Sequence, residues 1–290
     1  MDGRIFRTGS PLLAGRARPW AGAVLACCAV LVAVLGMLFA HQATAGWFDR
    51  TVDSPIIAWA AGHRGLALGI AYAGTLIPAG LVTAAIVAGC LLARRPGGAV
   101  LAVAAVPAAV GLVEGLLKPL IHRTYLGALV YPSGHTTAVF ALATVLTVLL
   151  MPPAGRRGPR ALRALRVLIP AAAAVLACLV AVAVTGLRWH YFTDTVAGAA
   201  VGIGTVLALA LILDLPAVRR LLGAAGGRPA IYGLSWSACP KGEETSNIGR
   251  RYSSAARIRC QAGLTGLRRR VGAIAGGRVA GAGRSDSPRT

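Results

Sequence analysis

The sequence predicts an all-α, polytopic membrane protein: a bundle of six transmembrane helices followed by a disordered, basic C-terminal tail. Two observations support this fold class. Over 290 residues, 56% are hydrophobic, only 13% are charged, and the mean hydropathy is +0.69, which is typical of membrane proteins rather than of soluble ones. In addition, six apolar runs approach the ~20 residues that an α-helix needs to cross a bilayer.

In chain order, the six expected spans are Ala21–Ala40, Leu66–Leu92, Gly98–Leu117, Ser133–Met151, Val167–Leu187 and Val196–Leu215. The first follows Arg16 and Arg18 and resembles a signal peptide. However, its apolar core is longer than a usual signal core and only a weak cleavage pattern follows it, which favours a retained anchor. The second is overlong and contains Pro78, so we expect a tilted or kinked helix.

These spans define three regions: a cytoplasmic N-terminal segment at 1–19, a membrane domain at 20–216 and a cytoplasmic tail at 217–290. The tail is rich in Gly, Ala, Ser and Arg without a sustained period, so we expect it to be disordered. In the last span, Gly198 and Gly202 form a face of small residues. This face predicts close packing within the bundle rather than dimerisation.

The distribution of Lys and Arg predicts the orientation. With the N-terminus in the cytoplasm, 25 of the 30 basic residues fall on the inner side, as the positive-inside rule requires. The outer segments retain five: Arg50, Arg64, Lys118, Arg123 and Arg188. The net charge of +21 is then mostly a property of the inner face. Basic residues on that side can interact with anionic lipid of the inner leaflet, so the positive charge does not require a nucleic-acid partner.

The first of two polar segments runs from Pro132 to His135, where an apolar helix is expected to begin. A Ser133–Gly134 turn that opens a helix offers backbone N–H groups and a positive dipole end to an anion, with His135 beside them. Ser133 could also be a plain N-cap. A cap, however, does not require the neighbouring histidine.

The second polar segment runs from Arg188 to Asp194. Asp194 follows His190 by four residues, so its carboxylate could hold the imidazole if the segment is helical or tightly turned. The alternatives are an interfacial histidine and a metal site, since His135, His190 and Asp194 are all legitimate ligand types. We disfavour a metal, because cations crowd the same site and a metal-bound imidazole would not be a nucleophile.

Two cations precede the first polar segment. Lys118 lies at the end of the third span, and Glu114, one helical turn earlier, is placed to pair with it. Interfacial snorkelling alone would also explain Lys118. Arg123 follows five residues later, and a planar guanidinium suits bidentate phosphate binding.

These motifs resemble the type 2 phosphatidic acid phosphatases, the lipid phosphate phosphatase superfamily that also includes vanadium haloperoxidases, over residues 20 to 216. The resemblance is to a bacterial integral-membrane member. It implies that His190 attacks phosphorus, that Asp194 orients His190, and that His135 protonates the leaving oxygen. It further implies that the phosphoryl oxygens are held by Lys118, Arg123 and the Ser133 and Gly134 amides, and that no cofactor is needed.

Two features depart from the family pattern. The arginine expected seven residues after Lys118 falls at Tyr125, whereas Arg123 lies two residues earlier. The arginine expected six residues before His190 falls at Val184, whereas the available Arg188 lies only two residues before the histidine. We expect Arg188 to make the phosphate contact instead.

The expected substrate is a lipid phosphate or diphosphate whose tail stays in the bilayer: polyprenyl diphosphate, phosphatidic acid or phosphatidylglycerol phosphate. The expected site faces the extracytoplasmic side of the cell membrane. Two alternatives stay open: a non-catalytic lipid-phosphate binding or transport protein, and a vanadate-dependent haloperoxidase, which the many spans disfavour. The sequence does not indicate an oligomeric state.

Overall fold

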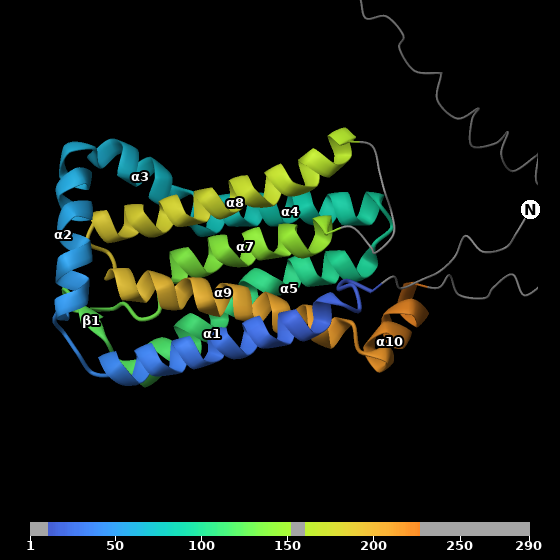
Figure 1. The fold of residues 1–290 in the computed structure, drawn as a ribbon, viewed down its shortest axis with the longest axis horizontal. Helices are drawn as coiled ribbons and strands as arrows, with labels where there is room; N and C mark the ends of the chain where they lie inside the picture. Colours follow the sequence, from blue (N-terminus) through green and yellow to red (C-terminus); the bar gives the residue numbers. More distant parts are fainter. Residues whose placement is uncertain (1–10, 152–159, 227–290) are drawn as a thin grey trace, which may run out of the picture. The chain divides into compact units, whose positions relative to one another are not determined.

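The computed structural model describes residues 11–151 and 160–226. The described chain is almost entirely helical (Figure 1). In chain order its elements are α1 (Ala17–Phe39), α2 (Trp47–Gly62), α3 (Arg64–Tyr72), α4 (Leu76–Leu92), α5 (Pro96–Leu112), the π-helical turn η1 (Val113–Leu117), α6 (Lys118–Ile121), β1 (Thr124–Tyr125), β2 (Ala128–Leu129), α7 (Gly134–Leu150), α8 (Arg160–Gly186), α9 (Phe192–Leu213) and α10 (Pro216–Gly226).

Each of the six expected spans coincides with a helical segment, but length and composition support fewer membrane crossings. Among the described residues, four helical segments are long and apolar enough to cross a membrane: α1, the continuous run Pro96–Ile121, α8 and α9. A fifth would be the pair α3 and α4, which is bent by 43° at a short break. The expected kink in the second span is therefore confirmed. Helix α7 is apolar but has only 17 residues.

Helix α7 lies in the interior of the bundle and packs closely against α9 (Figure 1). A Cβ atom added at Gly202 would lie only 2.5 Å from the Thr137 carbonyl oxygen, and one at Gly198 would lie 2.5 Å from that of Ser133. Only glycine permits such an approach, so the expected packing role of this small-residue face is confirmed. The close fit fixes the start of α7 against the first turns of α9, where both polar segments lie.

Helix α2 is not among the expected elements. It runs across one end of the bundle (Figure 1) and packs against α8 and α9. Two of its residues, Asp49 and Asp53, are buried against the rest of the protein. Because this helix carries carboxylates and is not among the candidate spans, its sequence does not resemble a membrane-crossing segment.

At the opposite end of the bundle, the residues just before and at the start of α1 contact the end of α9. The Asp214 carboxylate accepts hydrogen bonds from the backbone amides of Leu12 (2.7 Å) and Leu13 (2.9 Å), and it pairs with Arg18 at 3.3 Å. Helix α10 follows, so the first ten residues of the region expected to be a disordered tail are helical. The rest of that tail lies outside the described residues.

A two-stranded hairpin connects α6 to α7 at the same end of the bundle as α2. Strands β1 and β2 are antiparallel and pair Thr124 with Leu129. The turn between them contains Gly127 at a φ of +82°, a conformation that favours glycine. The Val130 amide then donates to the Arg123 carbonyl oxygen at 3.0 Å. This bond extends the hairpin and fixes the Val130 backbone, which forms part of the site described below.

Candidate active site

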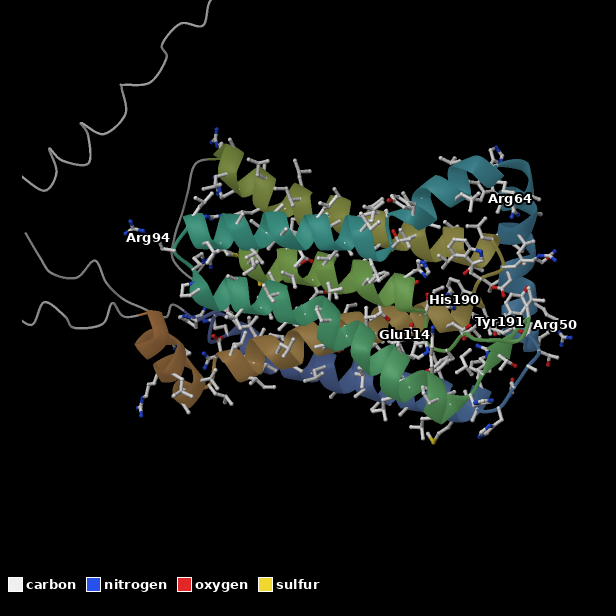
Figure 2. All side chains as sticks on the ribbon, turned by 180° about the vertical axis from the view of Figure 1, so that it is seen from behind. Arg50, Arg64, Arg94, Glu114, His190 and Tyr191 are labelled. Atoms are coloured by element: carbon white, nitrogen blue, oxygen red, sulfur yellow. The ribbon has the colours of Figure 1, made fainter. Side chains whose placement is uncertain are left out.

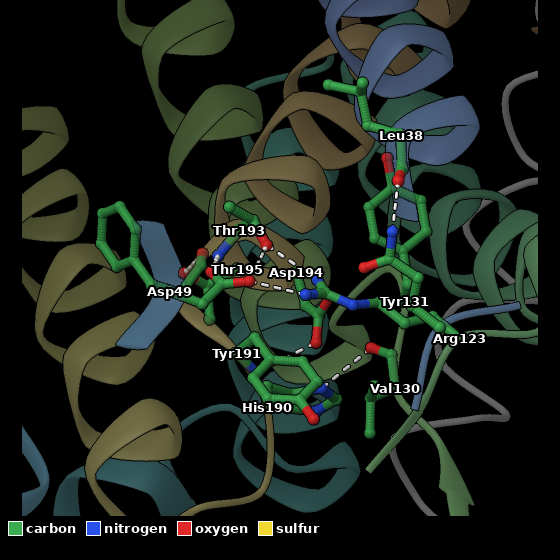
Figure 3. A network of polar contacts seen from close by, with 12 residues as sticks. Leu38, Asp49, Arg123, Val130, Tyr131, His190, Tyr191, Thr193, Asp194 and Thr195 are labelled. Atoms are coloured by element: carbon green, nitrogen blue, oxygen red, sulfur yellow. Dashed lines mark hydrogen bonds and ion pairs between the residues drawn. The ribbon is translucent and has the colours of Figure 1, made fainter. Parts of the chain in front are cut away.

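His190 lies in the short connection between α8 and α9, where its imidazole is held by the backbone. Its Nδ1 lies 2.9 Å from the carbonyl oxygen of Val130 (Figure 3). A carbonyl oxygen can only accept, so Nδ1 carries the proton and Nε2 keeps its lone pair. Only 7% of His190 is exposed. This burial and the nearby charge of Lys118 lower the pKa of His190 to about 3, so the imidazole is neutral at physiological pH.

His135 is the neighbour of His190. It occupies the first turn of α7, and the two imidazole ring centres are 6.2 Å apart. The ring of Trp189, which precedes His190, packs against His135 at 5.4 Å. The fold therefore brings together the histidines of both polar segments, one at a helix start and the other in the facing loop.

The start of α7 is capped by Ser133. Its hydroxyl oxygen accepts from the Thr136 amide at 3.4 Å, and its own amide donates to the Asp194 carbonyl oxygen at 3.0 Å. The Ser133 amide, expected to bind phosphate, is thus used within the protein. Gly134 and His135 fill the first two positions of the helix, where amides lack a partner in the preceding turn. Those two amides are placed to receive an anion.

Lys118 pairs with Glu114, as the sequence predicts. The Lys118 Nζ lies 2.8 Å from one oxygen of the Glu114 carboxylate and 2.9 Å from the other. The Lys118 side chain is only 15% exposed and the Glu114 side chain 49%. The π-helical turn η1 separates α5 from Lys118, and such turns recur at functional sites.

Arg123 is fully buried and binds two carboxylates (Figure 3). Its Nη2 lies 2.6 Å from Asp49 and its Nη1 lies 2.6 Å from Asp194. The guanidinium is stacked between the rings of Phe39 (4.0 Å) and Tyr191 (4.2 Å). The sequence predicts a phosphate contact for this residue. The structure instead directs the guanidinium into the protein, where it neutralises charge that would otherwise be buried and unpaired.

Asp194 does not contact His190 in the structure. One of its oxygens binds Arg123, and the other accepts from the Tyr191 amide at 3.0 Å. The reason is local: α9 begins at Phe192, so His190 precedes the helix cap and shares no helical face with Asp194. Asp194 occupies the third helical position, from which an acidic side chain reaches back to the cap residue. The Val130 carbonyl takes the place expected for this carboxylate.

Sequence reasoning missed two acidic residues of α2 that brace the start of α9. Asp49 accepts from the Thr193 amide at 3.1 Å and from its hydroxyl at 3.0 Å. Asp53 accepts from the Phe192 amide at 3.1 Å. Burial and the neighbouring Asp49 raise the pKa of Asp53 to about 7. Their spacing in the sequence could have indicated this role: two carboxylates four residues apart in a largely apolar stretch are expected to have buried polar partners.

Arg188 is exposed on the loop that contains His190. Its φ is +61°, in the left-handed region that few non-glycine residues adopt. It lies two residues before His190 in the chain and is not packed into the protein. Within the described parts of the chain, no three His, Cys, Asp or Glu side chains are grouped so as to hold a metal ion.

Comparison with known proteins identifies the family of the chain. A model of the PAP2 superfamily matches residues 12–215, which include both histidines and every described helix except α10. No curated protein and no solved structure matches the chain. A match to this superfamily supports phosphatase activity on phosphate esters. The match covers well over half of the sequence, and the chain therefore belongs to the PAP2 superfamily.

Proposed function

We propose that the protein is a membrane phosphatase that hydrolyses a lipid phosphate or diphosphate through a phosphohistidine at His190. One observation carries the proposal: the Val130 carbonyl holds the Nδ1 proton of a buried, neutral imidazole and leaves Nε2 free to attack. A nucleophile must be unprotonated at the reacting atom, and this geometry supplies that condition without a separate base.

The proposed reaction has two steps. The His190 Nε2 attacks phosphorus, a P–N bond forms, and the ester P–O bond breaks while His135 gives a proton to the leaving oxygen. Water then attacks the phosphohistidine, the P–N bond breaks, phosphate leaves, and His135 takes up the proton of the attacking water. Dividing the displacement into two steps lowers each barrier, and the scheme uses no cofactor or metal.

The phosphoryl oxygens need fixed positive charge, because phosphoryl transfer depends mainly on positioning and electrostatic stabilisation. We assign this role to Lys118, to the Gly134 and His135 amides, and to Arg188. Ser133 contributes by capping α7. We assign a positioning role to Arg123 and Asp194, which hold the start of α9 next to the loop of His190.

We further propose that all six helical segments cross the membrane and that the site faces outward. At a rise of about 1.5 Å per residue, α7 spans roughly 25 Å, and its interior position in the bundle tolerates a length below that of a lipid-exposed span. His190 lies at the end of the bundle opposite Arg94 (Figure 2). The positive-inside rule places Arg94 in the cytoplasm, so a lipid substrate would present its phosphate at the outer interface.

A non-catalytic lipid-phosphate binding or transport protein is the second candidate. It is favoured by one feature: two cations expected to clamp phosphate are paired with carboxylates, Lys118 with Glu114 and Arg123 with Asp49 and Asp194. A protein that had lost catalysis could retain the anion site at the start of α7.

Phosphate release by the purified protein distinguishes the two candidates. The substrates are phosphatidic acid, phosphatidylglycerol phosphate and polyprenyl diphosphate in mixed micelles. We expect at least one to be hydrolysed at full rate in the presence of chelator, and His190→Ala to abolish release. His63→Ala is the matched control, because His63 is an exposed histidine at the end of α2. Binding of a lipid phosphate without release would support the non-catalytic candidate.

A further inference from the structure

Glu114 is an acidic residue at a site expected to receive an anion. It lies on η1, and Figure 2 shows it at the same end of the bundle as His190. The Glu114 carboxylate lies close to the Gly134 backbone: a Cβ atom added to Gly134 would lie 2.7 Å from one carboxylate oxygen. A carboxylate therefore lies against the first residue of α7.

The groups around this carboxylate are those assigned above to the phosphate. Lys118 Nζ contacts both of its oxygens at 2.8 and 2.9 Å. The same Lys118 charge lowers the pKa of the buried His190, whose Nδ1 is held by the Val130 carbonyl oxygen. The Glu114 carboxylate thus contacts the Lys118 ammonium and lies against the first residue of α7.

We propose that Glu114 occupies part of the phosphate-binding position in the unliganded protein and is displaced when the phosphate binds. The inference rests on the proposed function of the site. In this arrangement Lys118 exchanges one anionic partner, the carboxylate, for another, the phosphoryl group. Glu114 is then a determinant of affinity and specificity, which weakens the binding of small free anions and of product phosphate.

Two properties of Glu114 make this exchange possible. Its side chain is about half exposed, and ion pairs of that kind contribute little stability, so the pair is easily broken. The side chain also comes from a π-helical turn, whose wider spacing is a common local feature of sites that bind ligands. The anion would approach the Gly134 and His135 amides once the carboxylate moves away.

Glu114 could instead support anion binding by holding Lys118 in place, and the two roles predict opposite effects of removing its charge. If Glu114 only holds Lys118 in place, its removal should weaken anion binding. If it competes with the anion, its removal should strengthen binding, by about three- to tenfold for one partly screened charge.

The probe is orthovanadate, titrated by calorimetry into the purified full-length protein in detergent. We expect Glu114→Gln, which keeps the shape and removes the charge, to lower the vanadate dissociation constant about three- to tenfold. Glu114→Ala should act in the same direction, which guards against an effect specific to glutamine. Glu243→Gln, at a glutamate outside the described residues, controls for charge removal as such.

An unchanged or raised dissociation constant in both Glu114 variants would overturn the inference, as would a failure of the wild type and of both variants to bind vanadate. Both results are distinguishable from failure of the proposed function. If wild-type protein releases phosphate from lipid phosphates while the Glu114 variants bind vanadate no more tightly, only the inference fails. If vanadate binds and the variants tighten it, but no lipid phosphate is hydrolysed, the inference holds and the catalytic proposal fails.

Discussion

The Nδ1 of His190 lies 2.9 Å from the carbonyl oxygen of Val130 and donates its proton to that oxygen. The contact joins residues 60 positions apart in the chain, and it fixes both the orientation of the ring and the tautomer. The hairpin that precedes α7 supplies the carbonyl, and the loop that precedes α9 supplies the imidazole.

The first prediction is that His190 stays neutral over the pH range in which histidine normally titrates. Its pKa of about 3 in the folded protein lies below the ordinary value of 6.5. The unfolded chain therefore binds more protons than the folded protein between those values, so His190 lowers stability as the pH falls through this window. Nitrogen NMR of histidine-labelled protein should show one Nδ1-protonated imidazole that does not titrate between pH 5 and 8. Its assignment follows from its loss in His190→Ala. A His190 resonance that titrates near 6.5 would contradict the description.

The second prediction concerns the buried Arg123. Its replacement by methionine would leave Asp49 and Asp194 buried without a counter-charge. This should lower the free energy of unfolding by about 3–5 kcal/mol. Arg123→Met should therefore lower the thermal unfolding temperature markedly, even without substrate. Arg64→Met, at an exposed arginine of α3, is the matched control. If Arg123→Met unfolded like the wild type and only raised KM, the residue would be a substrate contact instead.

The third prediction concerns Arg188. A charge-assisted contact to phosphate contributes about 1.5–3 kcal/mol, and each 1.36 kcal/mol changes a rate about tenfold. Arg188→Ala should therefore lower kcat/KM by roughly ten- to a hundredfold, and Arg188→Lys should restore only part because the planar fork is lost. Arg50→Ala, on the exposed part of α2, should change little. Equal, mild effects of both alanine variants would make Arg188 an ordinary surface charge.

The fourth prediction is topological. In a protein whose six native cysteines are replaced, a cysteine at Ala128 in the hairpin should react with an impermeant thiol reagent in intact cells. A cysteine at Ala93, after α4, should react only after lysis. Both positions are exposed, so accessibility to the reagent depends on the side of the membrane. The reverse pattern would place the site in the cytoplasm.

The sequence predicts the helical segments of the bundle well, because apolar runs are short-range features. The two histidines that it selects from local motifs lie near one another in the structure, with ring centres 6.2 Å apart. It predicts the Lys118–Glu114 pair for the same reason, since helical spacing alone places those residues together. Length and composition alone do not give the number of membrane crossings, because α7 is short and the pair α3 and α4 is broken.

The partners of Arg123 and His190 could not be predicted in this way. Asp49 lies 74 residues from Arg123, and Val130 lies 60 residues from His190. Both contacts depend on the placement of α2 and of the hairpin, neither of which has a pattern in the sequence strong enough to locate it. By contrast, the hydrogen bond from the Tyr191 amide to the Asp194 carboxylate could have been predicted from the sequence. An acidic residue at the third helical position commonly accepts from the amide of the cap residue.

The most direct test of the account is capture of the phosphoenzyme. Purified protein is mixed with a lipid phosphate labelled at phosphorus and quenched rapidly in base, in which phosphohistidine survives and from which acid later releases it. We expect a base-stable, acid-labile label that forms in chelator, appears on the peptide containing His190 and is absent from His190→Ala. Steady turnover by the wild type with no such label at any quench time would contradict the central claim that His190 is the nucleophile.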